Sequence, residues 1–162
     1  MNRRSTLMTL AGAALATTVS NAASAEGAHA LEGVWLVHVT PGPGAPPNTP
    51  EYDTVLFFAN GLMFEDNGAL GNGAGGVVGS SVQFGFYRFV RSGIFESTSW
   101  KVIAGPFGPA LVKLQVSMQM VSGTEYNGQV VGSVLDWQGK EEGINFQLVT
   151  HGTLLGQGVQ TA

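Results

Sequence analysis

The sequence predicts an all-β chain that folds into one eight-stranded antiparallel up-and-down β-barrel, with no significant helix after the first 25 residues. Three observations lead to this fold class. Apolar residues recur with a period of two rather than 3.6; Gly, Pro, Asn and Asp bound the apolar segments; and the later segments are long for a sandwich. Long meandering strands remove their exposed edges by closing into a barrel.

Eight segments have the composition and alternation of strands. The segment 110–122 is the clearest, because its apolar and polar residues alternate without a break, which predicts one buried and one solvated face. The predicted strands are residues 33–39, 52–58, 62–66, 81–91, 94–104, 110–122, 126–138 and 144–155.

The residues between these segments favour turns that connect sequence neighbours. Asn60-Gly61 and Ser92-Gly93 are typical of tight hairpins, while 105–109, 123–124 and 139–143 suit slightly longer ones. Each strand is therefore expected to pair with the next strand along the chain.

Two connections differ from these short turns in composition. Residues 41–50 hold five of the seven prolines, and residues 68–79 hold six glycines. We expect the first to be a stiff surface loop and the second to be a mobile flap, both near a mouth of the barrel.

The N-terminus has the three parts of an export signal. Arg3 and Arg4 are followed by an apolar run over 7–19 and by the small residues Ala23-Ser24-Ala25. The run is shorter than the roughly twenty residues that span a bilayer. The paired arginines resemble a bacterial twin-arginine signal, with ordinary secretion as the alternative.

Cleavage is therefore expected to release a single domain, residues 26–162, ordered from about 31 to 158. We expect a periplasmic or secreted bacterial protein without a membrane span. The chain has no cysteine, which excludes disulfides and thiolate chemistry. Its formal net charge is −4 and the leader removes two basic residues, so binding to nucleic acid is not expected.

Several motifs are similar to those of known barrel proteins. Gly33-Val34-Trp35 at the start of the first strand, then residues 57–61, then Gly85-Phe86-Tyr87, resemble the lipocalin and wider calycin barrels, and small exported bacterial lipocalin-like domains. The resemblance implies that Trp35 plugs the closed end. The layout also looks like that of allene oxide cyclases, dirigent proteins and some polyketide cyclases, which implies cofactor-free chemistry in an apolar cavity.

Other motifs predict neither a cofactor nor a metal. Residues 71–76 match G-x-G-x-x-G but lack the helix and parallel βαβ unit that a dinucleotide needs. No G-x-S-x-G occurs. His29, His38 and His151 are not spaced as ligand pairs, so we expect no metal site.

An enzyme in this barrel would need ionisable groups inside it. Glu96 and Asp136 lie within long strands, where a buried carboxylate would serve as acid or base. Tyr87, Arg88 or His151 would stabilise developing negative charge. These roles depend on which face of each strand is inward, and a shift of one residue reverses it.

The carboxylates at Glu65-Asp66 and Glu141-Glu142 are expected to be solvated at turns. Candidates for contact with a ligand are the predicted plug, strand-end polar residues, and the aromatic and methionine residues of the long strands. They are Trp35, His38, Phe86, Phe89, Arg91, Trp100, Met118, Met120 and Phe146.

Three functions remain open. The first is binding of a small apolar molecule in the interior. The second is a cofactor-free isomerase, cyclase or lyase in the same cavity, which predicts an inward carboxylate beside an inward Tyr, Arg or His. The third is a solidly packed barrel that acts through its surface, as a homo-oligomer joined along the aromatic strand 81–91, with no cavity larger than a few water molecules.

Overall fold

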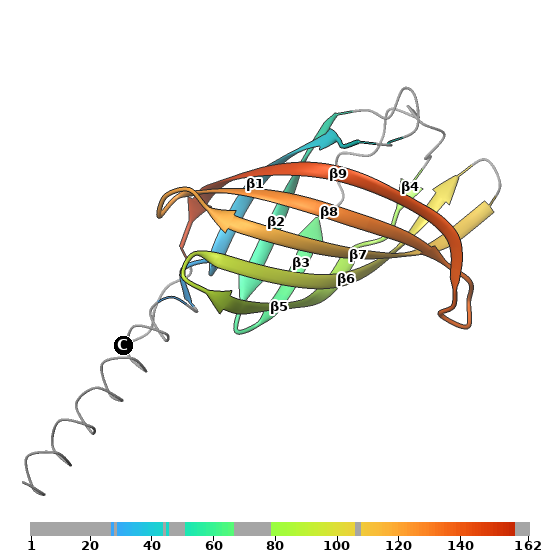
Figure 1. The fold of residues 1–162 in the computed structure, drawn as a ribbon, viewed down its shortest axis with the longest axis horizontal. Coiled ribbons are helices and arrows are strands. Elements are labelled where there is room, and N and C mark those ends of the chain that lie inside the picture. Colours follow the sequence, from blue (N-terminus) through green and yellow to red (C-terminus); the bar gives the residue numbers. More distant parts are fainter. Residues whose placement is uncertain are drawn as a thin grey trace, which may run out of the picture.

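The computed structural model describes residues 27, 29–43, 45, 51–66, 79–105 and 108–157. The predicted leader, residues 1–25, and most of the two unusual loops lie outside these residues. The strands are β1 (Gly33–Pro41), β2 (Tyr52–Ala59), β3 (Leu62–Asp66), β4 (Gly79–Ser80), β5 (Gln83–Arg91), β6 (Ile94–Gly105), β7 (Gly108–Met120), β8 (Glu125–Leu135) and β9 (Glu141–Gly156). Figure 1 shows them wrapped around a common axis.

The strands form one antiparallel sheet that closes on itself. The order β6-β5-β3-β2-β1-β9-β8-β7 is completed by pairing between β6 and β7, which gives an eight-stranded ring. The short β4 pairs with Ile103 and Ala104 of β6, beyond the point where the pairing of β6 with the beginning of β5 stops. The predicted all-β barrel is thus confirmed, and no helix element occurs in the described part of the chain.

Alternation along the strands decides which side chains enter the barrel. On β1, Trp35, Val37 and Val39 are buried, whereas Leu36 and His38 are exposed. The hairpin of β2 and β3 turns at Asn60 and Gly61, which have φ angles of 50° and 78°. Positive φ at both central residues matches the right-handed strand twist and fixes the register of this hairpin.

One end of the barrel is filled by aromatic side chains. Trp35 is fully buried, donates its Nε1–H to the carbonyl of Leu31 at 2.9 Å, and has its ring centroid 5.1 Å from that of Tyr126. A Cβ at Gly152 would overlap the Tyr126 ring, so glycine leaves the space that this ring occupies. Phe58, Tyr87, Phe95 and Met118 complete the cluster.

The opposite end is where the described strands meet the connections 42–51 and 67–78. Val39 of β1, Tyr52 of β2 and Glu65 of β3 mark this end. A second apolar cluster is centred on Val112 and Leu114 of β7 and Val130 of β8. We call the first end the plugged end.

Candidate functional site

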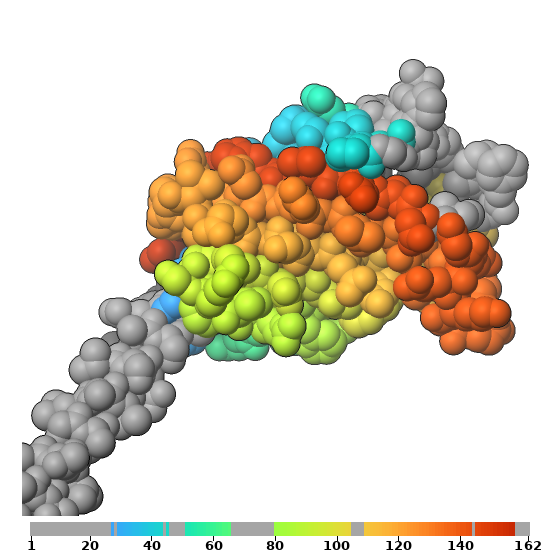
Figure 2. All heavy atoms as spheres, in the orientation of Figure 1, coloured from blue at the N-terminus to red at the C-terminus, as the bar shows by residue number. Residues whose placement is uncertain are grey.

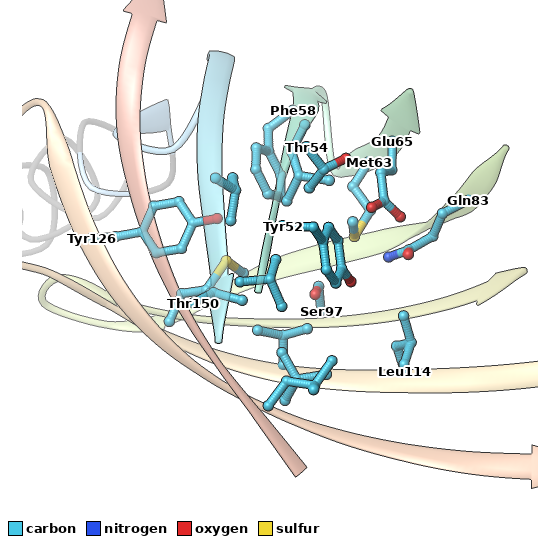
Figure 3. A pocket seen from close by; sticks show the side chains of 17 residues that line it. Tyr52, Thr54, Phe58, Met63, Glu65, Gln83, Ser97, Leu114, Tyr126 and Thr150 are labelled. Carbon is cyan, nitrogen blue, oxygen red and sulfur yellow. The ribbon is translucent and has the colours of Figure 1, made fainter. Parts of the chain in front are cut away.

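The candidate site is a cavity between the two ends of the barrel. Its volume is about 40 Å³, which leaves room for a few water-sized groups, whereas pockets for drug-sized ligands occupy roughly 300–1,000 Å³. The 17 side chains that line it are drawn in Figure 3. They are Val37, Val39, Tyr52, Thr54, Leu56, Phe58, Met63, Glu65, Gln83, Ser97, Leu114, Val116, Met118, Tyr126, Val130, Leu148 and Thr150.

Apolar and polar side chains occupy different parts of the cavity wall. β7 and β8 contribute apolar groups, including Leu114, Val116 and Val130. Most of the polar groups come from β2, β3, β5 and β6, and Figure 3 shows Glu65 and Gln83 on one side of the Tyr52 ring, with Thr150 and Tyr126 on the other. A mostly apolar pocket with a few polar groups is the usual form of a small-molecule site.

The polar part of the wall includes Glu65, one member of a buried ion pair. Lys101 Nζ lies 3.2 Å from Glu65 Oε2, and these side chains are only 7% and 4% exposed. Glu65 is opposite Gln83 in the β3–β5 register, and the Gln83 amide donates to Ser99 Oγ at 2.7 Å. These four side chains therefore form two bonded pairs.

Two hydroxyl groups in the same wall do not belong to these bonded pairs. Ser97 and Thr150 are both buried, and within the described residues neither Ser97 Oγ nor Thr150 Oγ1 has a hydrogen-bond partner. Both residues line the cavity, Ser97 from β6 and Thr150 from β9. Such unsatisfied groups are uncommon in native interiors, and each one calls for an explanation.

Two tyrosines bring phenol groups into the electrostatic field of the carboxylate. Burial raises the pKa of the Tyr52 and Tyr126 phenols above the usual 10.0, and the negative charge of Glu65 raises it further. Both phenols are therefore protonated at neutral pH and remain able to donate a hydrogen bond. An inward carboxylate thus lies close enough to inward tyrosines to affect their ionisation.

The residues predicted for catalysis are not brought together. Arg88 and Glu96 form an ion pair of 2.6 Å on the outer face, with side chains 76% and 46% exposed. Asp136 accepts from the backbone N–H groups of Gln138 and Lys140 in the turn after β8. His151 is on the outer face beside Asn127, and only Tyr87 of this set points inward.

The predicted ligand contacts are also divided between the two faces. Met118 lines the cavity; Trp35, Phe89 and Met120 belong to the cluster at the plugged end, and Phe146 packs in the second cluster. His38, which pairs with Asp53 at 2.8 Å, lies outside together with Phe86 and Trp100. Arg91 is exposed because the register shifts between Phe89 and Arg91.

The polar residues of the cavity wall were missed by sequence reasoning. Glu65 was expected in a solvated turn, but it is the fourth residue of β3 and shares the inward phase with Met63. The regular alternation of β7 could have identified the inward polar residues of β6. Val116 is inward and pairs with Ser97, so its phase assigns Ser97, Ser99 and Lys101 to the interior.

Comparison of the chain with protein-family models, curated proteins and solved structures finds no match. Among the described residues, no group of His, Asp or Glu side chains is placed to hold a metal ion. No helix in the described ranges has the length and hydropathy required to cross a bilayer. The function is therefore inferred from the cavity itself.

Proposed function

We propose that this chain is an exported lipocalin-like binding protein whose barrel takes up one small, largely apolar molecule. The observation that carries the proposal is the cavity, where an apolar wall faces a polar one that includes two hydroxyls without partners. A barrel selected only for packing would be expected to place alanine or valine at those positions, because a buried unpaired hydroxyl is unfavourable.

The size of the cavity limits the guest or requires the wall to adjust. At about 40 Å³ the cavity admits only a compact group without rearrangement, and this volume is also the upper limit expected for a solidly packed barrel. Met63 and Met118 line it, and methionine has three rotatable bonds and fits irregular shapes at small cost. A guest larger than the cavity would therefore enter by displacing these two side chains.

Two further parts of the proposal, export and the likeness to lipocalins, have separate support. The arginine pair and apolar run of residues 1–25 support export to the periplasm or medium. The position of Trp35 at the plugged end, with its indole bonded to Leu31, supports the resemblance to lipocalins. Cell fractionation and the mass of the mature chain test the first of these.

The binding proposal is tested by filling the cavity. Val130 lines it, while its neighbour Val131 points outward and is 44% exposed, so Val130→Phe and Val131→Phe form a matched pair. The protein is purified from its host and examined by native mass spectrometry, with extraction of any carried molecule. We expect wild type and Val131→Phe to carry a small molecule, and Val130→Phe to carry at least tenfold less.

Circular dichroism establishes that both variants are folded, since overpacking a core costs typically 1–3 kcal/mol. An empty wild-type chain that also takes up no added apolar compound would overturn the binding proposal. Equal loading of the two phenylalanine variants would place the bound molecule outside the cavity.

The second candidate is a cofactor-free isomerase, cyclase or lyase. It is favoured by Glu65, an inward carboxylate whose charge affects inward Tyr52 and Tyr126. In this function Glu65 would transfer a proton and Tyr52 would donate a hydrogen bond to developing negative charge. The extracted molecule, returned to fresh protein, distinguishes the candidates: it comes back unchanged from a binding protein and as a rearranged or cleaved product from an enzyme.

A further inference from the structure

The charges inside the barrel are already balanced. Lys101 and Glu65 face each other at 3.2 Å, and both are almost wholly buried. A guest carboxylate would bring a second negative charge to Glu65, which lines the cavity, while Lys101 is engaged. A guest cation would have to share a carboxylate whose charge Lys101 already balances. Burying a charge without a partner is strongly unfavourable, so the interior disfavours charged guests of either sign.

The hydrogen-bonding capacity, in contrast, is not used up. Ser97 is 5% exposed and Thr150 is 7% exposed, and among the described residues Ser97 Oγ and Thr150 Oγ1 have no partner. Each hydroxyl offers one donor and two acceptor positions. They come from β6 and β9, and both residues line the cavity. Both oxygens lie just behind the cavity surface, so a guest that displaces the wall slightly comes within their reach.

We infer that the preferred guest is an uncharged molecule whose apolar body carries a carbonyl or hydroxyl group, held by Ser97 and Thr150. This inference rests on the proposed binding function and adds the chemical class of the ligand. The apolar wall of β7 and β8 contacts the body of the guest, and the two hydroxyls satisfy its oxygen. Fatty acids are then poor guests because their carboxylate is charged. Pure hydrocarbons are poor guests because they leave the two hydroxyls without a hydrogen-bond partner.

Three probes with one ring test the class: cyclopentanol, cyclopentane and cyclopentanecarboxylate. Binding is followed through the methyl NMR signals of Met63 and Met118, which both line the cavity. We expect the alcohol to bind about five- to tenfold more tightly than the hydrocarbon, since a net hydrogen bond contributes a factor of this order. The carboxylate is expected to cause no shift at these methyl groups.

Near-isosteric variants add a second readout. Ser97→Ala and Thr150→Val remove the unpaired hydroxyls, so each is expected to leave the thermal midpoint of the guest-free protein equal or higher. Each is also expected to reduce the preference for the alcohol over the hydrocarbon, while the hydrocarbon's affinity is unchanged. Ser117→Ala, an exposed serine on the outer face of β7, is the control.

The outcomes distinguish the proposed ligand class from the proposed binding function. Tightest binding of the carboxylate, or equal binding of alcohol and hydrocarbon, would overturn the ligand class and leave the binding function intact. Failure of all three probes to shift Met63 or Met118 would count against the binding function itself. Loss of thermal stability in both hydroxyl variants would show that the hydroxyls are structural.

A separate observation concerns the outside of the barrel. The outer faces of β1, β2, β3 and β5 carry large apolar side chains that are each 36–51% exposed. We call them the aromatic face: Leu36, Phe57, Leu62, Phe64, Phe84 and Phe86. Phe57 lies opposite Phe64 and Phe64 opposite Phe84, and the Phe64–Phe84 and Phe84–Phe86 centroids are 5.6 and 5.5 Å apart. The face is therefore continuous.

The other side of the barrel is mainly polar on β7. The outward residues of β7 are Lys113, Gln115, Ser117 and Gln119, and Asn127 and Gln129 follow on β8, with the apolar Val131 and Val149 exposed on β8 and β9. Figure 2 looks onto this side, where β7, β8 and β9 lie next to one another. The exposed phenylalanine side chains of the described residues are thus gathered on one side of the molecule.

The extent of the aromatic face suits an interface. Phenylalanine side chains bury about 150–250 Å² each when covered, so six large residues at these exposures present on the order of 500 Å² of apolar surface. A stable protein interface buries about 800 Å² per partner, of which somewhat more than half is apolar. The Arg88–Glu96 ion pair, which carries both signs, and the His38–Asp53 hydrogen bond lie at its border.

The geometry points to a second copy of this chain as the partner, packed face to face on the aromatic face. A closed barrel has no free strand edge, so two copies associate through side chains. An uncharged centre avoids repulsion between two acidic chains, and a border that carries both signs can complement itself across a two-fold axis.

Analytical ultracentrifugation of the protein as its host produces it tests this interface. The wild type is expected to sediment as a multiple of the chain mass at micromolar concentration. Phe64→Glu and Phe84→Glu are expected to be monomers, because each places a negative charge at the centre of the contact. Gln115→Glu, on the polar side, is expected to behave as wild type. A monomeric wild type, or an oligomer that survives both phenylalanine substitutions, would overturn the proposal.

Discussion

Methionine in place of Lys101 is expected to lower the free energy of unfolding by about 3–5 kcal/mol, because it leaves the Glu65 carboxylate buried without a counter-charge. The Glu65 side chain is only 4% exposed, and Lys101 Nζ lies 3.2 Å from its carboxylate. Urea denaturation at neutral pH measures the loss as a lower midpoint with an unchanged slope.

Removing both charges is expected to restore most of this stability. The double variant Glu65→Gln, Lys101→Met should unfold within about 1 kcal/mol of wild type, because desolvation of two ions is no longer required. Arg88→Met at the exposed Arg88–Glu96 pair is the control and should cost less than about 1 kcal/mol. Equal effects of Lys101→Met and Arg88→Met would contradict the burial of the first pair.

Alanine in place of Trp35 is expected to cost about 3–5 kcal/mol, the range for deletion of a large buried aromatic side chain. Trp35 is wholly buried, packs on Tyr126, and bonds to the Leu31 carbonyl. Thermal and urea unfolding followed by circular dichroism measure the loss. The plugged end loses both its largest side chain and the group that ties Leu31 to β1.

Trp137 provides the comparison for this experiment. It is 63% exposed in the turn that follows β8, so Trp137→Ala should change the free energy of unfolding by no more than about 0.5 kcal/mol. Trp35→Phe should lie between the two, since it keeps an aromatic ring but loses the Nε1–H bond. A Trp35→Ala protein as stable as Trp137→Ala would show that the plug is not part of the core.

The fold could be predicted because several local signals agree. Alternation over 110–122 matches β7, and Asn60-Gly61 forms the tight hairpin that its composition favours. Closure into a barrel followed from strand length and short turns. The two-residue β4 was not predicted, and Gly79 was assigned to the connection 68–79, because so short a pairing leaves no periodic pattern in the sequence.

The site could not be predicted to the same degree, because periodicity alone does not say which phase is inward. Both phases of 83–91 carry aromatic residues, so the sequence left Tyr87 and Arg88 as alternatives. Pairing across strands resolves this: Tyr87 lies opposite Ser97 and Ser97 opposite Val116, which is inward. Glu96 shares the opposite phase and is therefore outside.

The bulge in β5 shows a further limit of sequence patterns. With perfect alternation Arg91 would share the inward face of Tyr87 and Phe89. The register shifts between Phe89 and Arg91, so Arg91 is exposed at the end of the hairpin. An irregularity of one residue is enough to move a candidate ligand contact from the interior to solvent.

The pairing of β1 with β9 joins the first and last strands of the barrel, and this makes synthesis of β9 a condition for closure. A nascent or truncated chain that lacks the sixteen residues of β9 has unpaired backbone groups along both β1 and β8. Two such edges are templates for strand addition by another chain. The slowest contact to form is also the one that removes them, so the period before β9 docks is when this protein is most exposed to aggregation and most in need of a chaperone.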